Sequence, residues 1–137
     1  MINNVFLSFA GEDREFGRRL LKVLSEQGVR VFVNGVVRGG PAWADNLRRG
    51  VDETDALVAV LTEVAIRGGI VLSEVGAAMA AHKPIMWVIP RNRRMPAGLP
   101  RPLAEFPIMR ISKLSDDEIG PVLRERLNAL QDARTAA

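Results

Sequence analysis

Two apolar runs without polar alternation constrain the fold of this chain more than any other feature. Six apolar residues stand together at Ala56–Leu61 and five at Ile85–Ile89. A strand with one face in water alternates apolar and polar residues, so these runs indicate strands that are buried on both faces of a parallel sheet. Similar short runs predict strands at Val5–Phe9 and Val29–Val33, and Ile108–Ile111 is a candidate edge strand.

Segments with helical periodicity separate these strands. Between Asp13 and Gln27 apolar residues recur every three or four positions, and Gly28 follows where a helix commonly ends. Further helices are expected around Trp43–Val51, over Ile70–His82 and over Ser115–Gln131, whereas the proline-rich segment Pro90–Pro107 is expected to be a loop. The alternation predicts an α/β fold: a doubly wound, five-stranded parallel sheet in the order 2-1-3-4-5, flanked by helices.

Composition excludes several classes of function. The 137 residues suit one domain, and no uncharged apolar run approaches the roughly 20 residues of a membrane span. Without a secretion signal, the expected location is cytoplasmic. There is no cysteine and only one histidine, His82, which removes disulfides, cysteine nucleophiles and cysteine-based metal sites. We therefore expect no metal, and any chemistry must use carboxylates, hydroxyls, basic side chains or the backbone.

The charge does not predict a nucleic-acid partner. The isoelectric point is near 10.2, but the formal net charge is only +3, because almost nothing titrates between neutral pH and the lysine range. The basic residues are scattered except at Arg91, Arg93 and Arg94, which are interpreted as a solvated loop.

Candidate functional residues follow the predicted strands. Ser8–Asp13 follows the first strand, a glycine-rich loop follows the second, and Thr62 and Glu63 follow the third, with Ser73 and Glu74 on the next helix. The carboxyl ends of parallel strands share one edge of the sheet, so these residues are expected to converge. The loop glycines 35, 39 and 40 lack the spacing of a dinucleotide-binding fingerprint, and no phosphate-loop lysine is present.

The ordered set of these segments resembles one family. Val5–Asp13 is similar to the first conserved box of Toll/interleukin-1 receptor (TIR) domains, in particular the bacterial and plant branches. The segment Arg38–Leu47 resembles the loop and helix after their second strand, and Asp52–Leu61 the approach to their third. Leu72–Ala80 resembles their glutamate-bearing helix. The resemblance implies one TIR domain with a flavodoxin-like fold over residues 1–131, and residues 132–137 are expected to form a frayed tail.

The resemblance also implies an activity. Glu74 matches the catalytic glutamate of members that cleave NAD⁺, either hydrolysing or cyclising it, so NAD⁺ would be substrate and no cofactor is expected. The residues expected to bind it are Ser8, Phe9, Ala10, Gly39, Gly40, Trp43 and Ser73. One departure stands at Ile70, where many members carry a tryptophan that could stack on a base.

A single carboxylate suits this reaction chemically. The nicotinamide of NAD⁺ is already cationic, so it can leave without the general acid that an ordinary glycoside requires. We expect Glu74 near the N-terminal turn of its helix, where the helix dipole favours the ionised carboxylate. That anion would stabilise the positive charge developing on ribose.

Two other functions stay open at this stage. Ile70 favours a TIR module that binds other TIR domains without catalysis, and Glu74-Val-Gly76 also resembles the glutamate context of nucleoside deoxyribosyltransferases. Family membership further implies self-association through the loop after the second strand, activation by assembly in defence or signalling, and a sensor module, attached or separate. Structurally, Trp43 suits the core with Leu47 and Val51, and Phe9 suits either core or pocket wall.

Overall fold

The central sheet has the predicted topology. The structure, a computed structural model, describes residues 1–34 and 41–136. Its strands are β1 Asn4–Ser8, β2 Arg30–Phe32, β3 Ala56–Val60, β4 Ile85–Ile89 and β5 Ile108–Arg110. All neighbouring pairs are parallel, in the order β2-β1-β3-β4-β5. Every residue of β3 and β4 is buried, which explains their unbroken apolar sequences.

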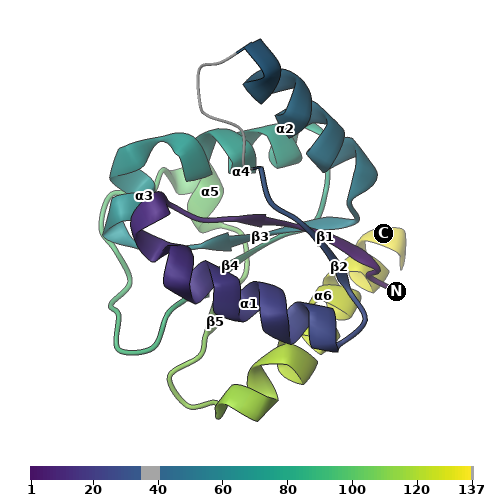
Figure 1. Cartoon of the computed structure of the whole chain (residues 1–137), viewed down its shortest axis with the longest axis vertical. Helices are drawn as coiled ribbons and strands as arrows, with labels where there is room; N and C mark the ends of the chain where they lie inside the picture. The colour runs from purple at the N-terminus through teal and green to yellow at the C-terminus, as the bar shows by residue number, and fades with distance from the viewer. Residues whose placement is uncertain (35–40, 137) are drawn as a thin grey trace.

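Helices cover both faces of this sheet (Figure 1). They are α1 Arg14–Glu26, α2 Pro41–Glu53, α3 Glu63–Gly68, α4 Ile70–Ala80, α5 Arg101–Ala104 and α6 Asp116–Ala136, with a 3-10 turn, η1, at Gly11–Asp13. Alternate strand residues face opposite sides: Val5 and Leu7 join the core beneath α1 and α6, whereas Phe6 and Trp87 join the core beneath α2 and α4. The sheet is therefore doubly wound, as predicted.

Several helix boundaries differ from the sequence prediction. The short helices α3 and α5 are absent from the sequence prediction. Four to six residues are too few to show a helical pattern of apolar residues, and Pro100 and Pro102 favour a loop. A proline is well tolerated in the first turn of a helix, which is where Pro102 lies. Gly69, with φ of 82°, separates α3 from α4 at the predicted break.

The last helix continues beyond its predicted end. We expected it to stop at Gln131, but α6 runs to Ala136. Residues 132–136 contain no glycine or proline, so nothing in their sequence ends the helix. The guanidinium group of Arg134 also donates a hydrogen bond to the carbonyl oxygen of His82, which joins the end of α6 to the residues that follow α4.

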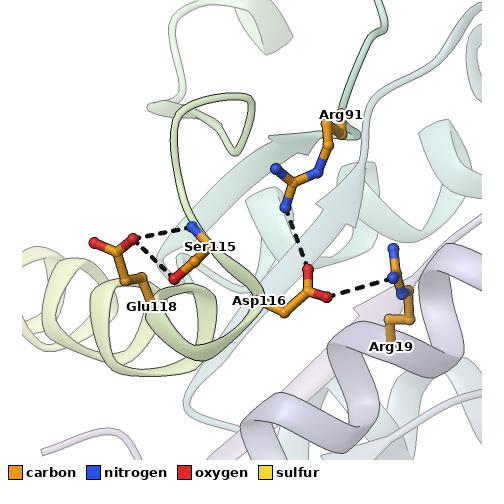
Figure 2. A network of polar contacts seen from close by, with 5 residues as sticks. All are labelled: Arg19, Arg91, Ser115, Asp116 and Glu118. Atoms are coloured by element: carbon orange, nitrogen blue, oxygen red, sulfur yellow. Dashed lines mark hydrogen bonds and ion pairs between the residues drawn. The ribbon is translucent and has the colours of Figure 1, made fainter.

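The start of α6 is fixed by two polar contacts (Figure 2). The backbone N–H and the hydroxyl of Ser115 each donate to Oε1 of Glu118 at 2.9 Å, which caps the helix and lowers the pKa of that carboxyl group. Asp116 lies between Arg91 and Arg19, with N–O distances of 3.2 and 3.6 Å. These exposed ion pairs add little stability, but they connect the loop after β4, α1 and α6.

Candidate active site

A buried serine and a buried glutamate meet at the carboxyl edge of the sheet. Ser8 is the last residue of β1, and Glu74 lies in the second turn of α4. The Ser8 hydroxyl donates to Oε1 of Glu74 at 2.6 Å, although 66 positions separate the two residues. Their exposed fractions are 1% and 4%, so water has little access to this hydrogen bond. A short hydrogen bond to a carboxylate in such surroundings holds the carboxylate in one orientation.

The packing of α4 explains why Glu74 reaches Ser8. Val71, Val75 and Ala78 recur at helical spacing and anchor α4 on the apolar face of the sheet. Glu74 precedes Val75 and is buried with it, so the helix face that packs on the sheet carries one carboxyl group among apolar neighbours. The strand β1 is central and lies between β2 and β3, which places its last residue beneath this helix.

Burial changes the protonation of Glu74. Desolvation raises the pKa of its carboxyl group from 4.5 to about 7, while the hydrogen bond from Ser8 and the nearby Asn34 side chain act in the opposite direction. Glu74 is the fifth residue of α4 and lies just beyond the first turn, where the helix dipole favours an anion most strongly. The dipole effect fades within the first turn, and burial dominates.

Asn34 is a site residue that the sequence analysis did not single out. It stands two residues after β2, at the same edge of the sheet as Ser8, and its side chain lowers the pKa of the Glu74 carboxyl group. Its position directly after a parallel strand was the available signal.

The structure separates the other predicted binding residues. Phe9 packs against Gly17 of α1, so its ring lies with the α1 core on the face opposite α4. Trp43 is half-buried against the core beneath α2 and α4. The Ser73 hydroxyl donates to the carbonyl oxygen of Gly69, the N-cap residue of its own helix, at 2.8 Å. Ala10 lines a cavity between the turn after β1 and α3, and the predicted residues Gly39 and Gly40 lie outside the described residues.

A cavity of about 240 Å³ lies beside the turn that follows β1. One wall is the turn after β1, and the other is α3 with the start of α4; its lining residues are Ala10, Gly11, Glu12, Val64, Ala65, Arg67, Gly68, Ile70 and Val71. Ala10 follows Ser8 by two residues, and Ile70 and Val71 precede Glu74 by one helical turn. Glu74 itself is not among the lining residues. Ile70, the departure from the family pattern, thus contributes an aliphatic wall.

Two features of the described part of the chain concern metal sites and membrane spans. Within residues 1–34 and 41–136, no three histidine or acidic side chains are grouped closely enough to hold a metal ion. No helix in that part is both long and apolar enough to cross a membrane.

Comparison with known proteins places the chain in a family. The family model described as the TIR domain matches residues 5–124, which run from the second residue of β1 through β5 into the first half of α6. The chain belongs to the TIR domain family. Among curated proteins, this TIR domain is 35% identical over 82 residues to disease resistance protein RUN1 of Vitis rotundifolia. The match covers 58% of the chain but only 6% of RUN1, so the chain corresponds to a small part of that relative.

Solved structures agree on the fold. The TIR domain of the Toll-related receptor TRR-2 from Hydra magnipapillata superposes with a TM-score of 0.67 at 20% identity, covering 93% of this TIR domain and 97% of that chain. The TIR domains of the activated Roq1 resistosome give 0.54 at 25% identity, covering 64% and 57%. The CMP N-glycosidase BcmB of Clostridium botulinum gives 0.60 at 21% identity, covering 89% and 99%.

Proposed function

We propose that this TIR domain cleaves the bond between nicotinamide and ribose in NAD⁺ and that Glu74 is its catalytic carboxylate. The observation that carries the proposal is the buried Ser8–Glu74 pair at the carboxyl edge of the sheet, together with a cavity lined by Ile70 and Val71, one helical turn before Glu74. Parallel α/β folds bind their ligands at this edge. The RUN1 and Roq1 relatives supply the setting, which is a TIR domain acting in defence or signalling.

The reaction requires one carboxylate and no acid catalyst. The bond between C1′ of ribose and N1 of nicotinamide breaks, and its electron pair neutralises the pyridinium nitrogen. Positive charge then develops on C1′ and the ring oxygen of ribose. The ionised Glu74 stabilises that charge, and water adds to C1′ with loss of a proton to give ADP-ribose. If an atom of the adenine ring adds instead, the product is cyclic.

The burial of Glu74 strengthens this effect. A carboxylate removed from water interacts with a nearby cation across a lower effective dielectric than an exposed one does. A cationic nicotinamide bound beside Glu74 lowers the pKa of the carboxyl group again, since opposite charges favour ionisation. The substrate therefore promotes the protonation state that its own cleavage needs.

A second candidate is cleavage of a nucleotide whose base is neutral. BcmB, which shares this fold, is described as a CMP N-glycosidase, and the context Glu74-Val-Gly76 also resembles nucleoside deoxyribosyltransferases. A neutral base leaves more readily when it is protonated. A Glu74 carboxyl group with a pKa of about 7 holds such a proton in much of the protein at neutral pH.

The pH dependence distinguishes the two candidates. The protein at high concentration is incubated with NAD⁺ or with CMP between pH 5.5 and 8.5, and released nicotinamide or cytosine is measured by chromatography. If ionised Glu74 cleaves NAD⁺, the value of kcat/KM is expected to rise through about pH 7 and then to stay level. Cleavage of CMP by the acid predicts a rate that falls over the same range. If neither base is released at any pH, the domain acts as a TIR interaction module without catalysis.

A further inference from the structure

A chain of hydrogen bonds joins the two walls of the cavity, which are the turn after β1 and α3. The backbone N–H of Asp13 donates to the carbonyl oxygen of Ala10 at 2.9 Å, which closes the turn after β1. The hydroxyl of Thr62 donates to Oδ2 of Asp13 at 2.5 Å, and the backbone N–H of Ala65 donates to the same hydroxyl at 3.1 Å. Ala10 and Ala65 both line the cavity, on opposite walls.

The position of Asp13 makes this contact informative. Asp13 is the residue that precedes the first turn of α1, where an aspartate normally accepts hydrogen bonds from the backbone of its own helix. Its side chain makes no such bond here. The carboxylate instead contacts Thr62, 49 positions away, and both residues are buried, with exposed fractions of 6% and 2%. The Asp13 side chain thus contacts a distant segment of the chain and not the backbone of its own helix.

The Thr62 hydroxyl both donates and accepts a hydrogen bond. It is the N-cap residue of α3, and its hydroxyl oxygen accepts from Ala65 in the usual manner. A threonine hydroxyl has one proton to donate, and that proton is directed at Asp13. The position and orientation of α3 therefore depend on Asp13, and the turn after β1 depends in return on α3.

We infer that Asp13 and Thr62 are positioning residues that hold the two walls of this cavity together and keep it formed in the absence of substrate. The inference rests on the proposed function for the identity of the substrate, but not for the coupling of the walls. We call the contact between Asp13 and Thr62 the brace. Glu74 is held separately by Ser8, so the brace acts on the walls of the cavity and not on the Glu74 carboxylate. A cavity that is already formed binds its ligand without the entropic cost of ordering its walls.

Amide hydrogen exchange on the substrate-free protein tests the coupling without reference to catalysis. Thr62→Val keeps the shape of the side chain and removes its hydroxyl group. We expect exchange at least tenfold faster at Ala65, which loses its cap, and also at Asp13 on the other wall. Asp13→Ala is expected to speed exchange at both places as well, although the Thr62 hydroxyl remains. Faster exchange that stays on the mutated wall in each variant overturns the inference.

Conservative variants separate the brace from general damage to the fold. Thr62→Ser keeps the hydroxyl group and is expected to restore exchange to within about threefold of the parent. Asp13→Asn keeps an acceptor oxygen for Thr62 and is expected to lie between the parent and Asp13→Ala. If Thr62→Ser exchanges as fast as Thr62→Val, the hydroxyl contacts are not the cause and the inference fails. Should Thr62→Val not fold, the Asp13 pair provides the same comparison.

Kinetics with NAD⁺ provides the second test. We expect Thr62→Val to raise KM about tenfold while kcat changes less than threefold, because the cavity is loosened and Glu74 is not displaced. An equal loss in kcat, with KM unchanged, contradicts a positioning role in the cavity. If the parent protein releases no nicotinamide, the proposed function has failed, and the exchange experiment still decides whether the brace exists.

Discussion

The Ser8 hydroxyl and the Glu74 carboxylate form a 2.6 Å hydrogen bond between the end of β1 and the second turn of α4. This contact places a carboxyl group where burial raises its pKa to about 7, in a domain whose size and family are those of a TIR domain. The buried position of Glu74 determines both its role in catalysis and its effect on the free energy of unfolding. These two quantities can be measured independently.

Replacement of Glu74 by glutamine is expected to abolish nicotinamide release. The amide has nearly the same shape but no negative charge, so the loss in kcat/KM should be on the order of a hundredfold or more, or about 3 kcal/mol of transition-state stabilisation. Chromatography of reactions with NAD⁺ measures this loss. Glu125→Gln, the same change on an exposed position of α6, is the matched control. Near-parent turnover in Glu74→Gln would show that Glu74 is not catalytic.

The same substitution is expected to stabilise the fold at neutral and higher pH. The folded-state pKa of about 7 exceeds the ordinary value of 4.5, so the folded protein retains a proton that the unfolded chain loses. The contribution of Glu74 to the stability of the parent therefore falls by about 3 kcal/mol as the pH rises from 4.5 to 7. Glu74→Gln lacks this term.

Urea unfolding at pH 5, 6, 7 and 8 measures the difference between the two proteins. The advantage of Glu74→Gln should grow with pH up to about 7 and then remain constant. A difference that is independent of pH would mean that the Glu74 carboxyl group titrates normally in the folded protein.

Removal of the Ser8 hydroxyl is expected to move the pH dependence of catalysis upward. The hydrogen bond from Ser8 lowers the pKa of Glu74, so Ser8→Ala should raise the pH at which half of the maximal kcat/KM is reached. A hydrogen bond to a charged group contributes about 1.5 kcal/mol, which corresponds to roughly one pH unit. Ser112→Ala, at an exposed position, serves as control. An unchanged midpoint in Ser8→Ala would separate Ser8 from the titration.

The crossing of α1 and α6 depends on the absence of a side chain at Gly120. A Cβ atom there would lie 2.9 Å from the backbone carbonyl oxygen of Val23, which cannot rotate away. Gly120→Ala should destabilise the protein by about 1 to 3 kcal/mol in urea unfolding. Gly76 has nothing within 4 Å of such an atom and lies inside α4, so Gly76→Ala should instead stabilise by about 0.5 to 1 kcal/mol. Equal effects of the two substitutions would refute this account of the helix crossing.

Activity is expected to depend on self-association. The resemblance to assembling TIR domains predicts that nicotinamide release per molecule increases with protein concentration, and that Gly39→Trp suppresses the increase. Gly39 lies outside the described residues, so this prediction rests on sequence and family alone. Initial rates from nanomolar to micromolar protein, with circular dichroism to verify folding, provide the measurement. Rates strictly proportional to concentration would indicate an active monomer.

The sequence determined the sheet, since burial of a parallel strand on both faces leaves a direct mark in Ala56–Leu61 and Ile85–Ile89. The order of strands and helices also predicted the carboxyl edge, and the resemblance to TIR domains singled out Glu74 as the candidate carboxylate. The sequence did not predict the protonation of Glu74, the part of Asn34 or the contact between Asp13 and Thr62. Those properties depend on which groups from distant segments meet and on how much water they lose, and only the packing of α3 and α4 on the sheet decides that.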